Sequence, residues 1–362
     1  MKLVLLIILL FFLGISNGQI NDSLQFSIAP KSGMITAHRP TMEHLPKNRS
    51  SILELTFQKQ DISNSKWSNA YKFPSRGYSI AFQDYGNKEV LGQAISIYRF
   101  TKFSLLQNEK IGFIDFKLGN GISFITEKYD PVGNTKNTAI GTHLNGFINC
   151  QILWVKYINN FNIGIGFDFT HQSNSAIKAP NLGINTYSGM ITLGYDLKKR
   201  VRFNSSIPKP EDAKMRDTPN WEVHFFAGIK QNLPNFKVSR TFGVMALQGL
   251  YKKQLSFKWD LELGLDFIYS EANRWFYSTT ATQFTDALQF GGYVGLAANI
   301  YKTQIYFGVG AYAFNPVDAA GWIYNRIGGR YLINENWNMM VGIKAHLGIA
   351  DYLEMGVGYR FN

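Results

Sequence analysis

A histidine and a serine stand two residues apart at the end of an alternating segment, as His171 and Ser173. Residues i and i+2 of a β-strand share one face, with Cβ atoms about 7 Å apart. An imidazole base and a hydroxyl group can therefore meet there, which permits attack by serine with histidine as the general base. The triple His-x-Ser is common, so the same residues also fit a strand that simply leaves lipid and turns polar.

The segment before this pair has the pattern of a strand with one apolar face. Odd positions from 161 to 169 are Phe or Ile, whereas the even positions are Asn, Gly, Gly, Asp and Thr. His171 and Ser173 continue the apolar row, where polar groups are costly unless they lie at the membrane interface. A tight turn at Asn160 and a long loop at 174–186 place the pair at the outer end of this strand.

Period-two alternation extends over most of the chain, as in 255–269 and again at the C-terminus in 353–361. A soluble sandwich would also alternate. The long strands, the aromatic residues near strand ends and the alternating C-terminal segment instead favour an all-β, antiparallel transmembrane β-barrel. A closed barrel leaves no unpaired edge in lipid.

We expect about sixteen strands, forming one barrel of about 14–16 strands, with two eight-stranded barrels as the alternative. The polar, proline-containing stretch 198–219 is the best internal boundary. The predicted units are a signal peptide at 1–18, a first half at 19–197, the connector 198–219 and a second half at 220–362. Long loops are expected on one side, but 59–76 and 198–219 are long where short turns should lie.

The composition of the 362 residues restricts the class of protein. With 45% hydrophobic, 15% aromatic and 17% charged residues, the chain is not intrinsically disordered. The single Cys150 excludes a disulfide scaffold and lies in an apolar row. A cationic start followed by apolar Leu3–Leu13 predicts export. The net charge of +12 then favours anionic lipid or glycolipid over nucleic acid as the partner.

The run His171-Gln-Ser173-Asn174, with Pro180-Asn181 downstream, resembles the active-site segment of the lipid A 3-O-deacylase family of outer-membrane barrels. The resemblance implies that His171 is the general base, Ser173 the nucleophile and Asn181 an oxyanion donor. It also implies hydrolysis of an ester-linked acyl chain of lipid A (lipopolysaccharide) in the bacterial outer membrane, without a cofactor.

One position departs from that family, which has a glutamate where this chain has Asn185. An asparagine can orient a histidine through its amide oxygen, as in Cys-His-Asn enzymes. It stabilises an imidazolium less than a carboxylate does. We therefore expect a slower esterase or an orienting group that comes from another loop.

A polar cluster in the first long loop, expected at residues 31–50, has three interpretations. It can be a solvated loop, or a phosphate or sugar contact made by Arg39, Lys47 and Arg49, with Lys178 adding a fourth cation. Alternatively, His38, Glu43 and His44 could bind a metal, although their spacing matches no known ligand set; we predict no metal site.

The second half lacks a copy of the His-Ser pair. His346 occupies the place that corresponds to His171, but no serine follows two residues later. The rival to an esterase is a non-enzymatic barrel that acts as a pore or a structural scaffold. Charged inward positions such as Lys258, Asp260, Glu262 and Asp266 fit either a channel or a plugged lumen.

Overall fold

The structure is a computed structural model that describes residues 24–63, 65–198, 200–201, 220–231, 240–277, 280–317, 321–347 and 349–361. The predicted signal peptide, 1–18, and most of the connector, 198–219, lie outside these ranges. The described part contains sixteen strands, which is the number that the alternation predicts. None of the helices described is long and apolar enough to cross a membrane.

The first eight strands form a closed antiparallel barrel in which β1 pairs with both β2 and β8. Its strands are β1 (Leu24–Ile35), β2 (Ser50–Gln60), β3 (Ser75–Asp84), β4 (Gln93–Asn108), β5 (Gly112–Ile125), β6 (Leu144–Ile158), β7 (Phe161–Ser173) and β8 (Ile184–Asp196).

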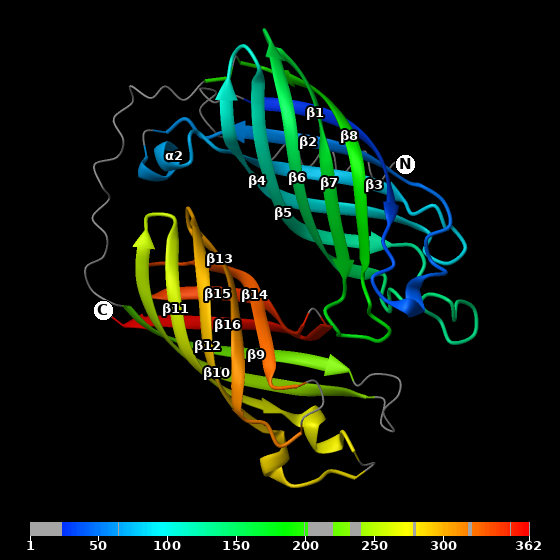
Figure 1. The fold of residues 1–362 in the computed structure, drawn as a ribbon, viewed down its shortest axis with the longest axis vertical. Coiled ribbons are helices and arrows are strands. Elements are labelled where there is room, and N and C mark those ends of the chain that lie inside the picture. The colour runs from blue at the N-terminus through cyan, green and yellow to red at the C-terminus, as the bar shows by residue number, and fades with distance from the viewer. Residues whose placement is uncertain are drawn as a thin grey trace.

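The last eight strands form a second closed barrel, in which β16 pairs back with β9 (Figure 1). Its strands are β9 (Asn220–Gln231), β10 (Thr241–Ser256), β11 (Trp259–Ser270), β12 (Leu288–Ile300), β13 (Thr303–Phe314), β14 (Ile323–Leu332), β15 (Trp337–His346) and β16 (Ile349–Phe361).

The chain is therefore an all-β protein of two transmembrane barrels, and the preferred expectation of one larger barrel is wrong. β8 returns to β1 instead of pairing with β9, so the alternative of two eight-stranded barrels is correct. Eight strands are enough to close a barrel whose interior is filled by side chains.

The two faces of the strands differ as the alternation predicts. On β7 the outward row is exposed and apolar, and Phe167 is 76% exposed. The inward row is buried and polar, and Asp168 is only 2% exposed. Such an exterior suits lipid, and the interior must satisfy its polar groups internally.

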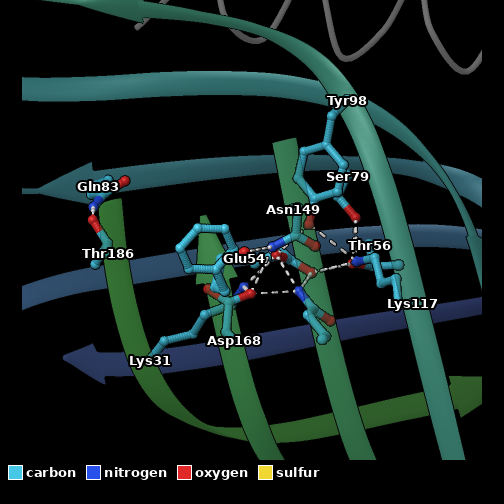
Figure 2. A network of polar contacts seen from close by, with 12 residues as sticks. Lys31, Glu54, Thr56, Ser79, Gln83, Tyr98, Lys117, Asn149, Asp168 and Thr186 are labelled. Carbon is cyan, nitrogen blue, oxygen red and sulfur yellow. Dashed lines mark hydrogen bonds and ion pairs between the residues drawn. The ribbon is translucent and has the colours of Figure 1, made fainter. Parts of the chain in front are cut away.

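A network of charges fills the first lumen (Figure 2). Glu54 lies 2.6 Å from the Lys31 ammonium and 2.7 Å from that of Lys117, and Lys31 also reaches Asp168 at 2.7 Å. The Tyr98 hydroxyl donates a 2.5 Å hydrogen bond to Glu54. Four strands, β1, β2, β5 and β7, therefore meet through opposite charges at the centre of the barrel.

The second lumen is filled in the same manner. Arg330 pairs with Glu262, and Arg326 donates a 2.6 Å hydrogen bond to Glu354. Glu262 and Asp266 are fully buried, so these members of the charged inward row lie in a plugged interior. This packing counts against a pore through either barrel.

Short helices occupy the connections. They are η1 (Pro40–Met42), α2 (Lys66–Ala70), η2 (Glu271–Trp275) and η3 (Phe284–Ala287). The stretch 59–76, which is longer than the short turn expected there, contains the helix α2. This helix lies beside the second barrel (Figure 1). The Trp67 ring centroid lies 6.3 Å from that of Tyr301, and the Tyr71 hydroxyl donates a 2.6 Å hydrogen bond to the Asn299 carbonyl.

Candidate active site

The His-Ser pair lies at the C-terminal end of β7, where the apolar row gives way to polar residues. His171 is half-buried, and Ser173 is 7% exposed. β8 runs antiparallel to β7, and its register sets Asn185 directly opposite His171. The pairing of these two strands therefore brings together residues that are fourteen positions apart in the chain.

A short hydrogen bond fixes the orientation of the imidazole. The Nδ1–H group of His171 donates to Oδ1 of Asn185 at 2.6 Å. With the proton on Nδ1, the Nε2 atom of the neutral ring is the nitrogen that can accept a proton. Asn185 thus holds the tautomer that a general base needs, as the carboxylate of a triad does.

His38 extends this chain of hydrogen bonds into the first loop. The Asn185 amide group donates to Nδ1 of His38 at 3.2 Å, and Nε2–H of His38 donates to the Leu182 carbonyl at 3.0 Å. This contact directs the amide nitrogen of Asn185 toward His38 and its oxygen toward His171. The group that contacts His171 is thus Asn185 itself, and the residue from another loop, His38, contacts Asn185.

The contribution of His38 cannot be seen in the sequence spacing. His38 lies 133 positions from His171 and follows β1, which pairs with β8 only because the barrel closes. The register Ile35–Thr186 brings the end of β1 next to the start of β8. Barrel closure is therefore the signal that would have placed this side chain.

The loop 174–183 surrounds the serine. The Ser175 backbone N–H donates to Ser173 Oγ at 3.1 Å, which orients that oxygen. Gly183 has a φ of 77°, and a Cβ at this position would lie 2.8 Å from His171 Cε1 and 3.4 Å from Ser173 Cβ. The absent side chain of Gly183 is what lets this backbone approach both residues.

Asn181 lies on the same loop, and one hydrogen bond shows which side of its amide group is the oxygen. Its Oδ1 accepts a 2.8 Å hydrogen bond from the Asn174 backbone N–H. The side-chain NH2 group is therefore the part of Asn181 that can donate to an oxyanion. The Asn174 side chain in turn donates to the Lys178 carbonyl at 2.8 Å and closes the loop on itself.

The basic residues expected to contact phosphate are spread over the loops at the same end of the first barrel. Lys178 is exposed on the loop 174–183, and Arg39 and Arg49 belong to the first loop. Lys47, also in the first loop, forms an exposed ion pair of 3.7 Å with Glu89. No contact links these side chains to His171 or Ser173 among the described hydrogen bonds.

The metal site considered for His38, Glu43 and His44 is not formed. The ring nitrogens of His38 are used as described above, and His44 donates a 2.6 Å hydrogen bond from Nε2 to the Lys136 carbonyl. In the part of the chain that the structure describes, no three such side chains gather as metal ligands. The cluster instead ties the first loop to neighbouring loops.

A recess lies at the opposite end from the His-Ser pair, at the mouth of the second barrel. It has a volume of about 230 Å³ and is lined by residues that include Trp67, Lys252, Asp260 and Arg360. The His-Ser pair instead faces outward from the barrel wall. A substrate that lies in the membrane would reach it from the side.

The comparisons with known proteins divide the chain in the same way as the fold. Residues 53–195 match the family "Lipid A 3-O-deacylase (PagL)", and residues 219–362 match "Acyloxyacyl hydrolase, C-terminal domain". No curated protein sequence is significantly similar to the chain.

Two kinds of solved structure are similar. The crystal structure of the outer membrane enzyme PagL has 14% identity, covering 46% of this chain and 97% of its own, with a TM-score of 0.33. A mutant porin from Rhodopseudomonas blastica has 12% identity over 94% of this chain and 100% of its own, with a TM-score of 0.19. The first barrel therefore belongs to the lipid A 3-O-deacylase family, and the second barrel is the acyloxyacyl hydrolase C-terminal domain.

Proposed function

We propose that this protein is a serine esterase of the bacterial outer membrane that hydrolyses an ester-linked acyl chain of lipid A. The observation that carries the proposal is the hydrogen bond from His171 to Asn185 on the neighbouring strand. His171 lies two positions before Ser173 on the lipid-facing wall of the barrel. It supplies an oriented base beside a hydroxyl group, which is the arrangement that nucleophilic acyl transfer requires. Family membership supports lipid A as the substrate class.

The reaction would proceed in two acyl-transfer steps. Nε2 of His171 takes the proton of Ser173 Oγ as that oxygen attacks the ester carbonyl, and the side-chain amide of Asn181 donates to the resulting oxyanion. The tetrahedral intermediate collapses, and His171 returns the proton to the departing alcohol of the lipid. Water, activated by the same histidine, then hydrolyses the acyl-serine and releases the fatty acid.

Asn185 has a narrower role here than a carboxylate would have. It holds the Nδ1–H tautomer of His171, and the contact with His38 prevents a flip of the Asn185 amide group. A neutral amide, however, offers no charge to the imidazolium that forms when the serine loses its proton. Tautomer control is thus retained and charge stabilisation is lost, which predicts a competent but slower enzyme.

Substrate access follows from the position of the site on the barrel wall. The exposed row Ile163, Ile165 and Phe167 leads along β7 toward His171, so acyl chains can lie against it. Lipid A would diffuse laterally and present its ester from the outer leaflet. Arg39, Lys47, Arg49 and Lys178 are proposed to contact its phosphate groups from the surrounding loops.

The decisive experiment compares lipid A from cells that express the wild-type protein with lipid A from cells that express Ser173→Ala. Mass spectrometry is expected to show the loss of one hydroxyacyl group with the wild type and intact lipid A with the variant. Folding of both proteins is checked by the heat-dependent gel mobility that barrels show. Unchanged lipid A with a folded wild-type barrel would leave a scaffold role in its place.

A further inference from the structure

The second barrel contacts the loop that carries the proposed oxyanion donor. Gln231 is the last residue of β9, and its backbone N–H donates to the Ala176 carbonyl at 3.2 Å. Its side-chain oxygen accepts a 2.8 Å hydrogen bond from the Ala179 backbone N–H. One residue of the C-terminal domain therefore holds both sides of the turn 176–179, and Figure 1 shows the end of β9 beside this loop.

The backbone at this turn is in a conformation that needs support. Ser175 and Ala176 have φ angles of 54° and 66°, in the left-handed region that residues with a side chain rarely adopt. Such a residue is strained and persists only when its surroundings hold it in place. The hydrogen bond to the Ala176 carbonyl acts directly on this strained pair.

The same turn is coupled to the reacting groups through hydrogen bonds. Ser175 donates its backbone N–H to Ser173 Oγ, and Asn174 donates its own to Oδ1 of Asn181. A shift of residues 175–179 therefore changes the position of the nucleophile oxygen and of the oxyanion donor together. Misplacement of reacting groups by about 1 Å can cost as much as a factor of 100 in rate.

We propose that Gln231 is a positioning residue through which the C-terminal barrel holds the active-site loop of the N-terminal barrel in its reactive conformation. This inference rests on the proposed function, because it assigns the second barrel a part in the same site. Gln231 touches neither Ser173 nor His171 and acts only through the backbone of the loop. The proposal explains why a barrel without a His-Ser pair accompanies the one that has it.

The test uses the full chain in detergent micelles with purified lipid A and measures fatty-acid release. Gln231→Ala is expected to lower kcat about tenfold and to change KM by less than about twofold, because positioning of an oxyanion donor matters in the transition state. Gln231→Glu keeps an oxygen that accepts from the Ala179 N–H and is expected to restore most of the rate. All rates are normalised to the folded fraction.

Tyr71→Phe is the matched control. It removes the hydrogen bond to Asn299 at the opposite end of the contact between the barrels and leaves the loop 174–183 untouched. We expect wild-type kinetics from this variant. Equal rates for Gln231→Ala and the wild type, or equal losses in Gln231→Ala and Tyr71→Phe, would overturn the proposal.

A second readout separates this inference from the proposed function. Hydrogen exchange of peptides from the loop 174–183, followed by mass spectrometry, is expected to accelerate about tenfold in Gln231→Ala and to remain unchanged in Tyr71→Phe. If the wild type releases no fatty acid, the proposed function fails, and exchange still decides whether Gln231 holds the loop. Identical exchange rates in Gln231→Ala and the wild type would refute the proposal that Gln231 holds this loop in place.

Discussion

The centre of the proposed site is a line of three hydrogen-bonded side chains, His171, Asn185 and His38. They provide only part of what a catalytic triad provides. A carboxylate would orient the histidine and also stabilise its charged form, whereas Asn185 can do only the first. An amide has one oxygen and one nitrogen, so it must be held the right way round. His38 does this by accepting from the amide nitrogen. From the sequence, His171, Ser173, Asn181 and Asn185 were predicted as site residues, whereas His38 was considered only as a metal ligand.

Replacing the amide by a carboxylate tests this division. Asn185→Asp keeps the size of the side chain and gives the imidazolium an opposite charge. We expect kcat for deacylation to rise about tenfold, because a hydrogen bond to a charged group is worth about 1 kcal/mol more than a neutral one. The measurement is fatty-acid release from lipid A in micelles. A fall in kcat would show that the charge of residue 185 does not limit the rate.

His38→Ala provides the matching control in both backgrounds. In the wild type it is expected to lower kcat about tenfold, since the Asn185 amide loses the partner that fixes its direction. In Asn185→Asp the loss should be smaller, because both oxygens of a carboxylate can accept from His171. Equal losses in the two backgrounds would contradict the orienting role of His38.

Gly183 is predicted to be intolerant of any side chain. Its φ of 77° and the 2.8 Å approach of a Cβ to His171 Cε1 mean that Gly183→Ala displaces the imidazole. We expect at least about a hundredfold loss of kcat, in line with the cost of misplacing a catalytic group. Gly189→Ala on β8 is the control, because its Cβ meets nothing within 4 Å. Equal activity of the two variants would refute the prediction.

Neighbouring strands build the site and the lumen at the same time. β7 presents His171 and Ser173 outward and Asp168 inward, and its pairing with β8 supplies Asn185. The alternation in the sequence predicted these strands because lipid and a polar interior impose opposite demands on successive residues. The helix α2 was not predicted: its five residues give too short a pattern, and one of its partners, Tyr301, belongs to the other barrel.

The lumen network predicts a large cost for removing its central carboxylate. Glu54 is 2% exposed and pairs with Lys31 and Lys117, so Glu54→Ala leaves two buried ammonium groups without this partner. We expect a destabilisation of about 3–5 kcal/mol. It is measured as a lower temperature of the gel-mobility transition or a lower urea midpoint in micelles.

Glu89→Ala is the control for Glu54→Ala. It removes the exposed ion pair with Lys47 and should cost less than about 1 kcal/mol, because surface charges are well solvated when separated. A Glu54→Ala barrel as stable as the Glu89→Ala barrel would mean that water replaces the carboxylate in the lumen.

The division into two barrels could not be read from the sequence, because each strand alternates in the same way in either arrangement. One long-range choice decides it: β8 pairs with β1 and β16 pairs with β9. Two narrow barrels have interiors that side chains can fill, whereas one barrel of sixteen strands would enclose an aqueous channel. The number of barrels therefore bears directly on whether the protein conducts ions.

We predict that the wild-type protein forms no steady channel in a planar lipid bilayer. Arg326 and Arg330 cross the second lumen and pair with Glu354 and Glu262, so no continuous water path is expected there. The double variant Glu262→Ala/Arg330→Ala removes both members of one pair together, which avoids leaving an unpaired buried charge. We expect it to conduct intermittently where the wild type is silent. Steady conductance by the wild type, in the absence of acyl release, would instead favour a pore, because only an open lumen could carry that current.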